Sequence, residues 1–402
     1  PISLERLDIT KKVSIIIPTF NRALYLKEAI ESAVNQTYDN TEIIVIDDGS
    51  TDDTSEVVRF YTDNITYMHK ENGGKSSALN MAIQKASGDY IWYLDDDDIA
   101  LPKKLELQMR YLQKFPENAI LFTGALGFTD TKLFRKVDYS YLVHSIKKDD
   151  LLLRFLEDCI VTGQSALVES QCFKTIGHYR NDLRRSEDHE MWIRIARKFP
   201  LGFLNFPTIL RRSHEGLRGG KDANSNPKDH DLEGLIYGRL FFPEVYNSLS
   251  LDELIPALKK NPSNIGLQSK AFIEKGLIAA LYIYGDYAIA DLKKAQDFLK
   301  GNDISIPEET FNKVIVIIRR LTTPSFKNQL KGVFSEIVLT IGLLSNRNEI
   351  FLHLLRRCYW QAIEYFKRRN YLVSGKWFVS AFKFCFLYYI YLYRSRFLNK
   401  KN

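Results

Sequence analysis

The sequence predicts an α/β fold with a largely parallel β-sheet, followed by an α-helical C-terminal region. Two observations support this prediction. In the first half of the chain, short runs rich in Val and Ile alternate with amphipathic stretches, which is typical of a parallel sheet covered by helices on both faces. From about residue 232 onward strand candidates become rare and helical periodicity dominates.

The first half contains five short apolar runs, each the length of a buried strand. They are "VSIIIP" (13–18), "EIIVID" (42–47), "ITYMH" (65–69), "YIWYL" (90–94) and "AILFTGAL" (119–126). The intervening stretches have helical periodicity, and proline suits a first helical turn. Helices are therefore expected near 24–35, 52–62 and 76–86 and from Pro102 onward.

A domain boundary is expected near residue 230. The preceding segment, "EGLRGGKDANSNPKDHD" (215–231), is rich in Gly and Asn and predicts a loop. The chain of 402 residues is long enough for two such domains. We therefore predict an N-terminal α/β domain over 1–230 and an α-helical domain over 231–402.

Basic charge is concentrated at the C-terminal end. Residues 351–402 contain eleven Lys or Arg and one acidic residue, whereas the whole chain carries a net charge of +7. The stretch 377–397 is also dense in aromatic residues. This combination predicts binding to an anionic membrane surface or to anionic groups on a partner. The alternative is a helix pair that packs its aromatic side chains inward.

The sequence predicts a cytoplasmic location, with the basic aromatic tail as a candidate for peripheral attachment to the inner face of the membrane. The four cysteines lie far apart and form no C-x-x-C pair, which fits a reducing compartment. The segment "PISLERLDITKK" lacks the apolar core of a secretory signal. No uninterrupted apolar span of about 18 residues predicts a transmembrane helix.

Polar clusters follow three of the predicted strands, as "PTFNR" (18–22), "DDGSTD" (47–52) and "DDDD" (95–98). The carboxyl ends of parallel strands meet at one sheet edge, where ligands of α/β proteins bind. Carboxylate oxygens suit a hard divalent cation such as Mg²⁺ or Mn²⁺, which could bridge to a diphosphate. The chain has no G-x-G-x-x-G and no Walker A loop, and "DDDDIALPKKLE" lacks the central glycine of an EF-hand.

Five motifs in order resemble the inverting family 2 glycosyltransferases of GT-A fold. They are "VSIIIPTFNRALYLKEAIESAVNQTY", "EIIVIDDGSTDDT", "ENGGKSSALNMAI", "GDYIWYLDDDDIALP" and "GHYRNDLRRSEDHEMWIRIARKF". The resemblance covers roughly 11–215. It implies a Rossmann-like GT-A domain that moves one sugar from a UDP-sugar to a hydroxyl of a glycan, lipid-linked or protein acceptor.

The resemblance also implies roles on the donor side. Pro18, Thr19, Phe20 and Asn21 would border the nucleotide base, and Asp48 would accept a hydrogen bond from the uracil imide. Two aspartates of the acidic run, Asp95 and Asp96, would reach the ribose and the sugar. Lys75, which follows two glycines, would lie near the diphosphate.

The metal ligands and the general base are implied in the same way. Asp97 would bind Mn²⁺ or Mg²⁺, and His214 in "RRSHEGLRGG" would complete the metal site. Arg212 or Arg218 would steady the leaving diphosphate. Asp188, rather than Glu187, would take the proton from the acceptor hydroxyl as that oxygen attacks the anomeric carbon.

The sequence departs from relatives in two respects. The processive synthases that "NGGKSSALN" resembles carry a Q-x-x-R-W motif and transmembrane helices, and neither is found here, so transfer of one sugar per encounter is expected. A position often occupied by Arg is Leu79 in this chain.

No nucleic-acid partner is expected, and the oligomeric state is open. The alternatives are a nucleotidyltransferase that uses the same aspartates and metal, or a non-catalytic sugar-binding relative.

Overall fold

The computed structural model describes residues 7, 9–129, 132–134, 150–213, 230–282 and 284–299. The chain divides into two compact units, Pro1–Leu240 and Phe241–Asn402. This division falls inside helix α9 (His230–Ser248). The domain boundary near residue 230 stays a prediction.

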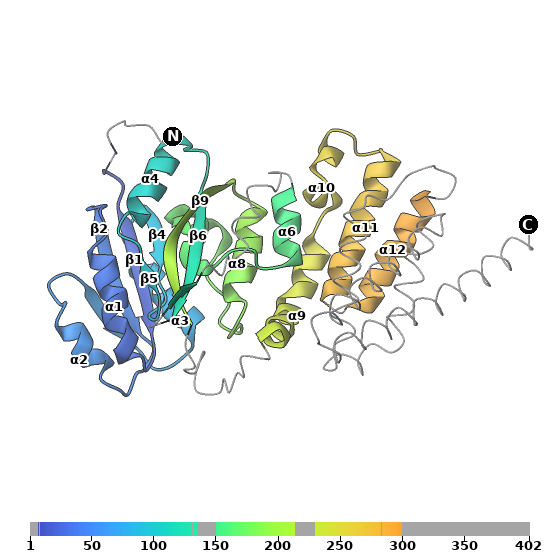
Figure 1. Cartoon of the computed structure of the whole chain (residues 1–402). Helices are drawn as coiled ribbons and strands as arrows, with labels where there is room; N and C mark the ends of the chain where they lie inside the picture. Colours follow the sequence, from blue (N-terminus) through green and yellow to red (C-terminus); the bar gives the residue numbers. More distant parts are fainter. Residues whose placement is uncertain are drawn as a thin grey trace, which may run out of the picture. The chain divides into compact units, whose positions relative to one another are not determined.

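A mixed β-sheet forms the centre of the first unit. Its strand order is β3-β2-β1-β4-β8-β6-β9-β5, and β7 pairs with β6 (Figure 1). The strands are β1 (Val13–Thr19), β2 (Thr41–Asp47), β3 (Thr66–His69), β4 (Tyr90–Tyr93), β5 (Ile99–Ala100), β6 (Ile120–Thr129), β7 (Lys132–Phe134), β8 (Leu167–Glu169) and β9 (Leu201–Arg212). Strands β1 to β4 pair in parallel, whereas β8 is antiparallel to both β4 and β6.

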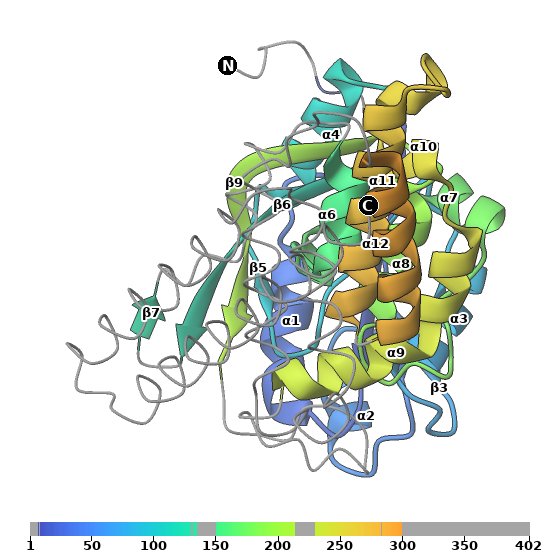
Figure 2. The same cartoon turned by 90° about the vertical axis from the view of Figure 1, so that its right-hand side faces the viewer.

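Helices cover both faces of this sheet. They are α1 (Ala23–Val34), α2 (Thr54–Arg59), α3 (Lys75–Lys85), α4 (Lys104–Lys114), α6 (Leu151–Glu157), the short 3₁₀ turn η2 (Gly163–Ser165), α7 (Ser170–Ile176) and α8 (Glu187–Ala196). Because side chains alternate along a strand, Ile15 and Ile17 of β1 face a core built with α1, α2 and α4. Ile16 faces the other side, where Leu79 of α3 and Trp192 of α8 line a small apolar cavity; Figure 2 shows α3 and α8 from the side.

The predicted α/β class is confirmed, and strands β1 to β4 and β6 lie where the apolar runs predicted them. The sequence pattern did not reveal β5, β8 and β9. Strands β5 and β8 are only two and three residues long, too short to show a period. Strand β9 contains polar and proline positions, and its register against β6 shifts between Thr123 and Ala125.

The second unit is helical in the residues that the structure describes. It contains the end of α9, then α10 (Leu251–Leu254), the 3₁₀ turn η4 (Pro256–Lys259), α11 (Ile265–Leu281) and α12 (Gly285–Leu299). Helices α11 and α12 lie side by side (Figures 1 and 2). Asn264 caps α11, since its side-chain oxygen accepts the Leu267 N–H at 2.9 Å.

Some of the predictions fall outside the described residues. These are His214, Arg218, residues 215–229 of the predicted loop, and the basic aromatic tail over 351–402. Among the helices that the structure does describe, none has both the length and the apolar character needed to cross a membrane.

Candidate functional site

The loops that follow β1 and β2 are tied together at the carboxyl edge of the sheet. Asn21 adopts a left-handed conformation with φ of 52°, which is uncommon for a residue other than glycine. Its backbone N–H donates to Ser50 Oγ at 2.8 Å, and its side-chain oxygen accepts the Thr51 N–H at 2.7 Å. Pro18 and Thr19 are buried just before this turn and Phe20 is half-buried, so the predicted base-binding segment is held firmly against the loop after β2.

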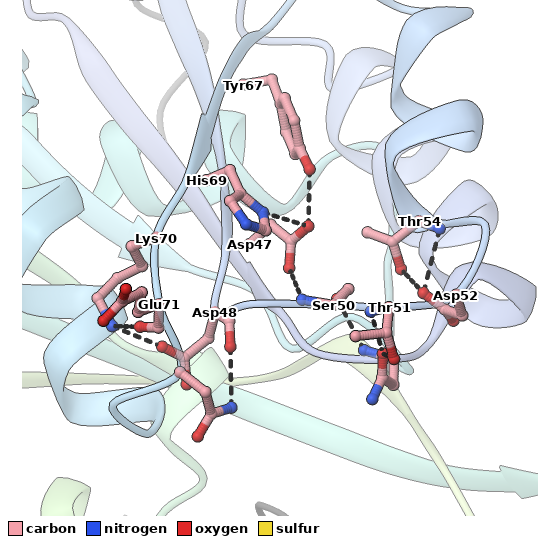
Figure 3. Close-up of polar contacts among 12 residues, drawn as sticks. Asp47, Asp48, Ser50, Thr51, Asp52, Thr54, Tyr67, His69, Lys70 and Glu71 are labelled. Atoms are coloured by element: carbon pink, nitrogen blue, oxygen red, sulfur yellow. Dashed lines mark hydrogen bonds and ion pairs between the residues drawn. The ribbon is translucent and has the colours of Figure 1, made fainter.

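Asp48 organises the loop between β3 and α3. Its carboxylate accepts the backbone N–H groups of Gly73 and Gly74 at 2.9 and 2.7 Å and pairs with Lys70 Nζ at 2.7 Å. The Asn72 side chain donates to the Asp48 carbonyl at 2.8 Å, and Figure 3 shows Lys70 beside the Asp48 carboxylate. The residue predicted to accept the uracil imide thus also fixes the glycine loop that leads to Lys75.

Asp47 makes a second polar cluster beside Asp48 (Figure 3). Its buried carboxylate accepts the Tyr67 hydroxyl at 2.6 Å and the Ser50 N–H at 2.8 Å, and it lies 3.2 Å from His69 Nδ1. Burial raises the pKa of Asp47, but the hydrogen bonds from Ser50 and Tyr67 lower it more, so the net direction is downward. Asp47 therefore stays ionised and holds the turn that carries Asp48.

The four-aspartate run forms the turn between β4 and β5. One carboxylate oxygen from each of Asp95, Asp97 and Asp98 lies within 4.8 Å of the others. Burial raises the pKa of Asp96 to about 7, although Arg22 opposes the shift and Asp97 adds to it. Burial and the charge on Asp97 also raise the pKa of Asp98. Burial therefore favours the protonated forms of Asp96 and Asp98, and the charge on Asp97 adds to the effect.

Two arginines support this turn from opposite directions. Arg22 pairs with Asp96 at 3.3 Å and more closely with Asp97. Arg212 is buried at the end of β9, donating from its backbone N–H to Asp98 Oδ1 at 2.9 Å and from Nε to the Asp97 carbonyl at 3.1 Å. Its guanidinium also pairs with Glu28 at 2.8 Å. Arg212 thus braces the backbone of the acidic turn against helix α1.

Lys75, the first residue of α3, connects two acidic segments that are distant in sequence. Its Nζ lies 2.5 Å from Asp95 Oδ1 and 3.7 Å from Glu187 Oε1. Burial lowers the pKa of Lys75, but the carboxylates of Asp95 and Glu187 raise it more, and the net direction is upward. The ammonium is therefore charged and brings the start of α8 close to the four-aspartate run.

The start of α8 presents Glu187 and Asp188 in its first turn, where acidic groups favour the helix dipole. The preceding residue, Ser186, is left-handed with φ of 61°. Burial raises the pKa of Glu187 to about 7, with Lys75 opposing the shift and Asp188 adding to it. Asp188 is less buried, and its Oδ1 accepts the His189 N–H at 2.7 Å.

The structure brings together most of the predicted site residues. Lys75 pairs with both Asp95 and Glu187, and Glu187 is next to Asp188 in the chain. In the acidic turn, which also contains Asp96, the Asp97 carbonyl accepts a hydrogen bond from Arg212. Arg212 faces Glu28 and the Asp97 carbonyl, so a role at the diphosphate stays a prediction. The other site predictions lie at the end of β1, at Pro18 and Thr19, and in the loops after β1 and β2, at Phe20, Asn21 and Asp48.

Sequence reasoning did not single out Arg22 or Asp98. Arg22 is the last residue of the segment "PTFNR". A basic residue just after a strand, at the same sheet edge as an acidic run, could have indicated that it pairs with that run. Asp98 was part of the acidic run but was given no role. Its oxygen lies with those of Asp95 and Asp97, a set of hard carboxylate donors that suits Mg²⁺ or Mn²⁺.

Comparison with known proteins identifies relatives of this chain. A model of the family described as "Glycosyl transferase family 2" matches residues 14–177. The chain is 37% identical over 224 residues to an uncharacterized glycosyltransferase, RP339, of Rickettsia prowazekii, which covers 55% of this chain and 70% of that protein. It is also 37% identical over 218 residues to an uncharacterized glycosyltransferase of Rickettsia felis, covering 53% of this chain but only 36% of that protein's length.

The fold also has a counterpart among solved structures. The crystal structure of S. aureus TarS superimposes with a TM-score of 0.50 at 16% identity, over 81% of this chain and 55% of that chain. At this identity the likeness shows the fold alone, and it agrees with the GT-A class that the sequence motifs imply. From the family match and the identity over most of the Rickettsia prowazekii protein, the chain belongs to glycosyl transferase family 2.

Proposed function

We propose that this chain is a metal-dependent, inverting glycosyltransferase that moves one sugar from a UDP-sugar to an acceptor hydroxyl. One observation carries the proposal: carboxylates from the four-aspartate run and from the start of α8 meet around Lys75. A donor-binding edge and a candidate general base are thereby held in one site. Membership of glycosyl transferase family 2 favours sugar transfer over nucleotidyl transfer as the chemistry of this site.

The donor nucleotide would lie against the loops after β1 and β2. Phe20 offers an aromatic face to the base, and Asp48 retains lone pairs for the uracil imide beside its existing donors. Asp95 and Asp96 would reach the ribose and the sugar. The Lys75 ammonium would attract the diphosphate, because it lies beside the same edge of the sheet and stays charged.

Asp97, together with Asp95 and Asp98, would hold Mn²⁺ or Mg²⁺, and His214 is a further candidate ligand. The three described carboxylates fit such an ion by donor type and by the closeness of their oxygens. A bound divalent ion would supply charge neutralisation for the leaving diphosphate. Arg212 or Arg218 would add a second cationic contact there.

Asp188 would act as the general base on the acceptor side. It would accept the proton of the acceptor hydroxyl while that oxygen attacks the anomeric carbon from the face opposite the diphosphate, which inverts the configuration. Glu187 is less suited, since it is buried and pairs with Lys75. The acceptor class proposed is a glycan, lipid-linked or protein hydroxyl, and the basic tail would hold the enzyme near an anionic membrane surface.

The test is release of UDP from a panel of UDP-sugars by the full chain, with Mn²⁺ and with a chelator in its place. The proposal expects UDP release from at least one donor, stimulated by an acceptor glycan and abolished by the chelator. Consumption of a nucleoside triphosphate with pyrophosphate release would instead identify a nucleotidyltransferase. Binding of UDP-sugars without any turnover would identify a non-catalytic relative.

A further inference from the structure

Arg22 is a partly buried cation that contacts the acidic turn without belonging to it. It is the residue immediately before α1, and its carbonyl accepts the N–H groups of Tyr25 and Leu26 at 3.0 and 3.1 Å. The next backbone N–H, that of Ala23, donates to Asp52 at 3.1 Å. The backbone of Arg22 is therefore fixed, while its side chain, 17% exposed, extends to the acidic turn.

The aspartates of the turn fall into two overlapping sets. Asp96 and Asp97 pair with the Arg22 guanidinium, whereas the three oxygens close enough to share a cation belong to Asp95, Asp97 and Asp98. Asp97 is the member common to both sets. A cation bound at the second set would therefore need the carboxylate that Arg22 contacts most closely.

We propose that Arg22 is the resident counter-ion of Asp97 and competes with the divalent ion for this carboxylate. The inference rests on the proposed metal site and adds its regulation. When a divalent ion occupies the site, the guanidinium moves away from Asp97 and keeps Asp96 as its partner. The affinity of the protein for the metal alone is thereby held down.

The structure limits this exchange to the Arg22 side chain. Arg212 holds the backbone of the turn through the Asp97 carbonyl and the Asp98 carboxylate, so the turn itself need not rearrange. The Arg22 guanidinium also repels a divalent ion electrostatically at this short range, in surroundings that screen charge much less than water does. Both effects predict weaker metal binding while Arg22 carries its charge.

The experiment is calorimetric titration of Mn²⁺ alone into the full chain and into three variants. Arg22→Gln keeps a hydrogen-bond donor but removes the charge, and it is expected to bind Mn²⁺ about tenfold more tightly. Arg22→Lys keeps the charge and is expected to stay within about threefold of the unmodified protein. Arg110→Gln, which breaks the 3.1 Å pair with Glu106 on α4, is the matched control and is expected to change nothing.

Two results would overturn the proposal, and they are distinguishable. Unchanged or weaker Mn²⁺ binding by Arg22→Gln, with a circular dichroism spectrum and melting temperature like those of the control, would show that Arg22 does not compete for Asp97. Absence of Mn²⁺ binding in every protein, with and without UDP, would remove the metal site itself and with it the proposed function. Tighter binding by Arg22→Gln and not by Arg22→Lys would support the exchange.

Discussion

Adjacent carboxyl groups at the start of α8 experience different surroundings. Glu187 is buried against Lys75 and its pKa is raised by burial to about 7. Asp188 is more exposed and is oriented by the His189 N–H. A base must be accessible to the hydroxyl that it deprotonates, which favours the more exposed Asp188 for the proposed role and leaves Glu187 beside Lys75.

Substitution of this single residue, Asp188→Asn, is expected to lower turnover by about 10²–10⁴-fold, because the amide cannot accept the proton from the acceptor. Affinity for UDP should change little, since the proposed function gives Asp188 a contact with the acceptor and none with UDP. Turnover is measured by UDP release, and UDP affinity is measured by calorimetry.

Glu187→Gln is the neighbouring control for that substitution. It keeps the size of the side chain and leaves Asp188 unchanged, so its turnover should stay well above that of Asp188→Asn. Turnover of Asp188→Asn equal to that of the unmodified chain would contradict the assignment of the base.

The acidic residues of the site could be predicted from sequence, but their partners could not. The composition of the run 95–98 and its place after a strand predicted that its carboxylates gather at one turn, and the oxygens of Asp95, Asp97 and Asp98 do lie together; that they bind a cation stays a prediction. Which aspartate pairs with which cation depends on side-chain directions within one turn, and those are set by Arg22 and Arg212, which are 74 and 115 residues away from Asp96 and Asp97.

Among the elements, the turn η2 brings Gly163 close to both Tyr93 of β4 and Asp188 of α8. A Cβ added to Gly163 would lie 1.4 Å from the Tyr93 hydroxyl and 3.2 Å from Asp188 Oδ2. Tyr93 is buried and its ring lies 4.8 Å from Lys75 Nζ. The absence of a side chain at Gly163 therefore lets Tyr93, Lys75 and Asp188 share one space.

Gly163→Ala is expected to destabilise the chain by about 1–3 kcal/mol, because the Tyr93 ring is confined and the added methyl group overpacks the turn. Turnover should fall as well, since Asp188 would be displaced. Thermal unfolding and UDP release measure the two effects.

The matched control for this element is Gly234→Ala in α9, where an added Cβ would meet nothing within 4 Å. Alanine favours helix over glycine, so this variant should be as stable as the unmodified chain or more so. Equal melting temperatures for Gly163→Ala and the unmodified chain would show that η2 is not a tight spacer.

Elements with a clear hydrophobic period were predictable from sequence, and those defined by tertiary pairing were not. Strand β1 has seven consecutive buried residues, and the apolar run over 13–18 identified it directly. Strand β5 consists of Ile99 and Ala100 alone, and it exists because both residues pair with Ile209 and Leu210 of β9. No local pattern encodes such a pairing.

For the molecule as a whole, burial of acidic groups couples stability to pH. Glu187 titrates with a pKa of about 7 in the folded protein, above its ordinary value of 4.5. Between these two values the folded state binds more protons than the unfolded state does. The stability contributed by protonated Glu187 is therefore complete below about pH 4.5 and is lost as the pH rises through about 7.

The melting temperature of the metal-free protein is accordingly expected to fall as the pH rises from 5 to 8. Glu187→Gln lacks the stability that protonated Glu187 contributes, so its melting temperature should fall less over this pH range. The unfolding free energy of Glu187→Gln should likewise fall by roughly 1–3 kcal/mol less than that of the unmodified protein. Thermal unfolding in the presence of a chelator at several pH values measures the difference. Parallel curves for the two proteins would show that Glu187 is not held protonated by the fold.

The change from alternating strands to helical periodicity near residue 232 predicted a domain boundary near residue 230, which stays a prediction. The division between Leu240 and Phe241 was not predictable, since α9 runs continuously from His230 to Ser248 across it. A helix that belongs to two compact units leaves no break in hydrophobic pattern for sequence reasoning to detect.

The ammonium of Lys75 has a thermodynamic consequence, since it shares its charge between Asp95 and Glu187. Any ligand that draws Asp95 away makes Glu187 the main remaining partner of Lys75, which favours the ionised form of Glu187. Such linkage is reciprocal: under the proposed function, if the donor changes the affinity for the acceptor through Glu187, the acceptor changes the affinity for the donor by the same factor. The proposed donor and acceptor sites would then fill cooperatively.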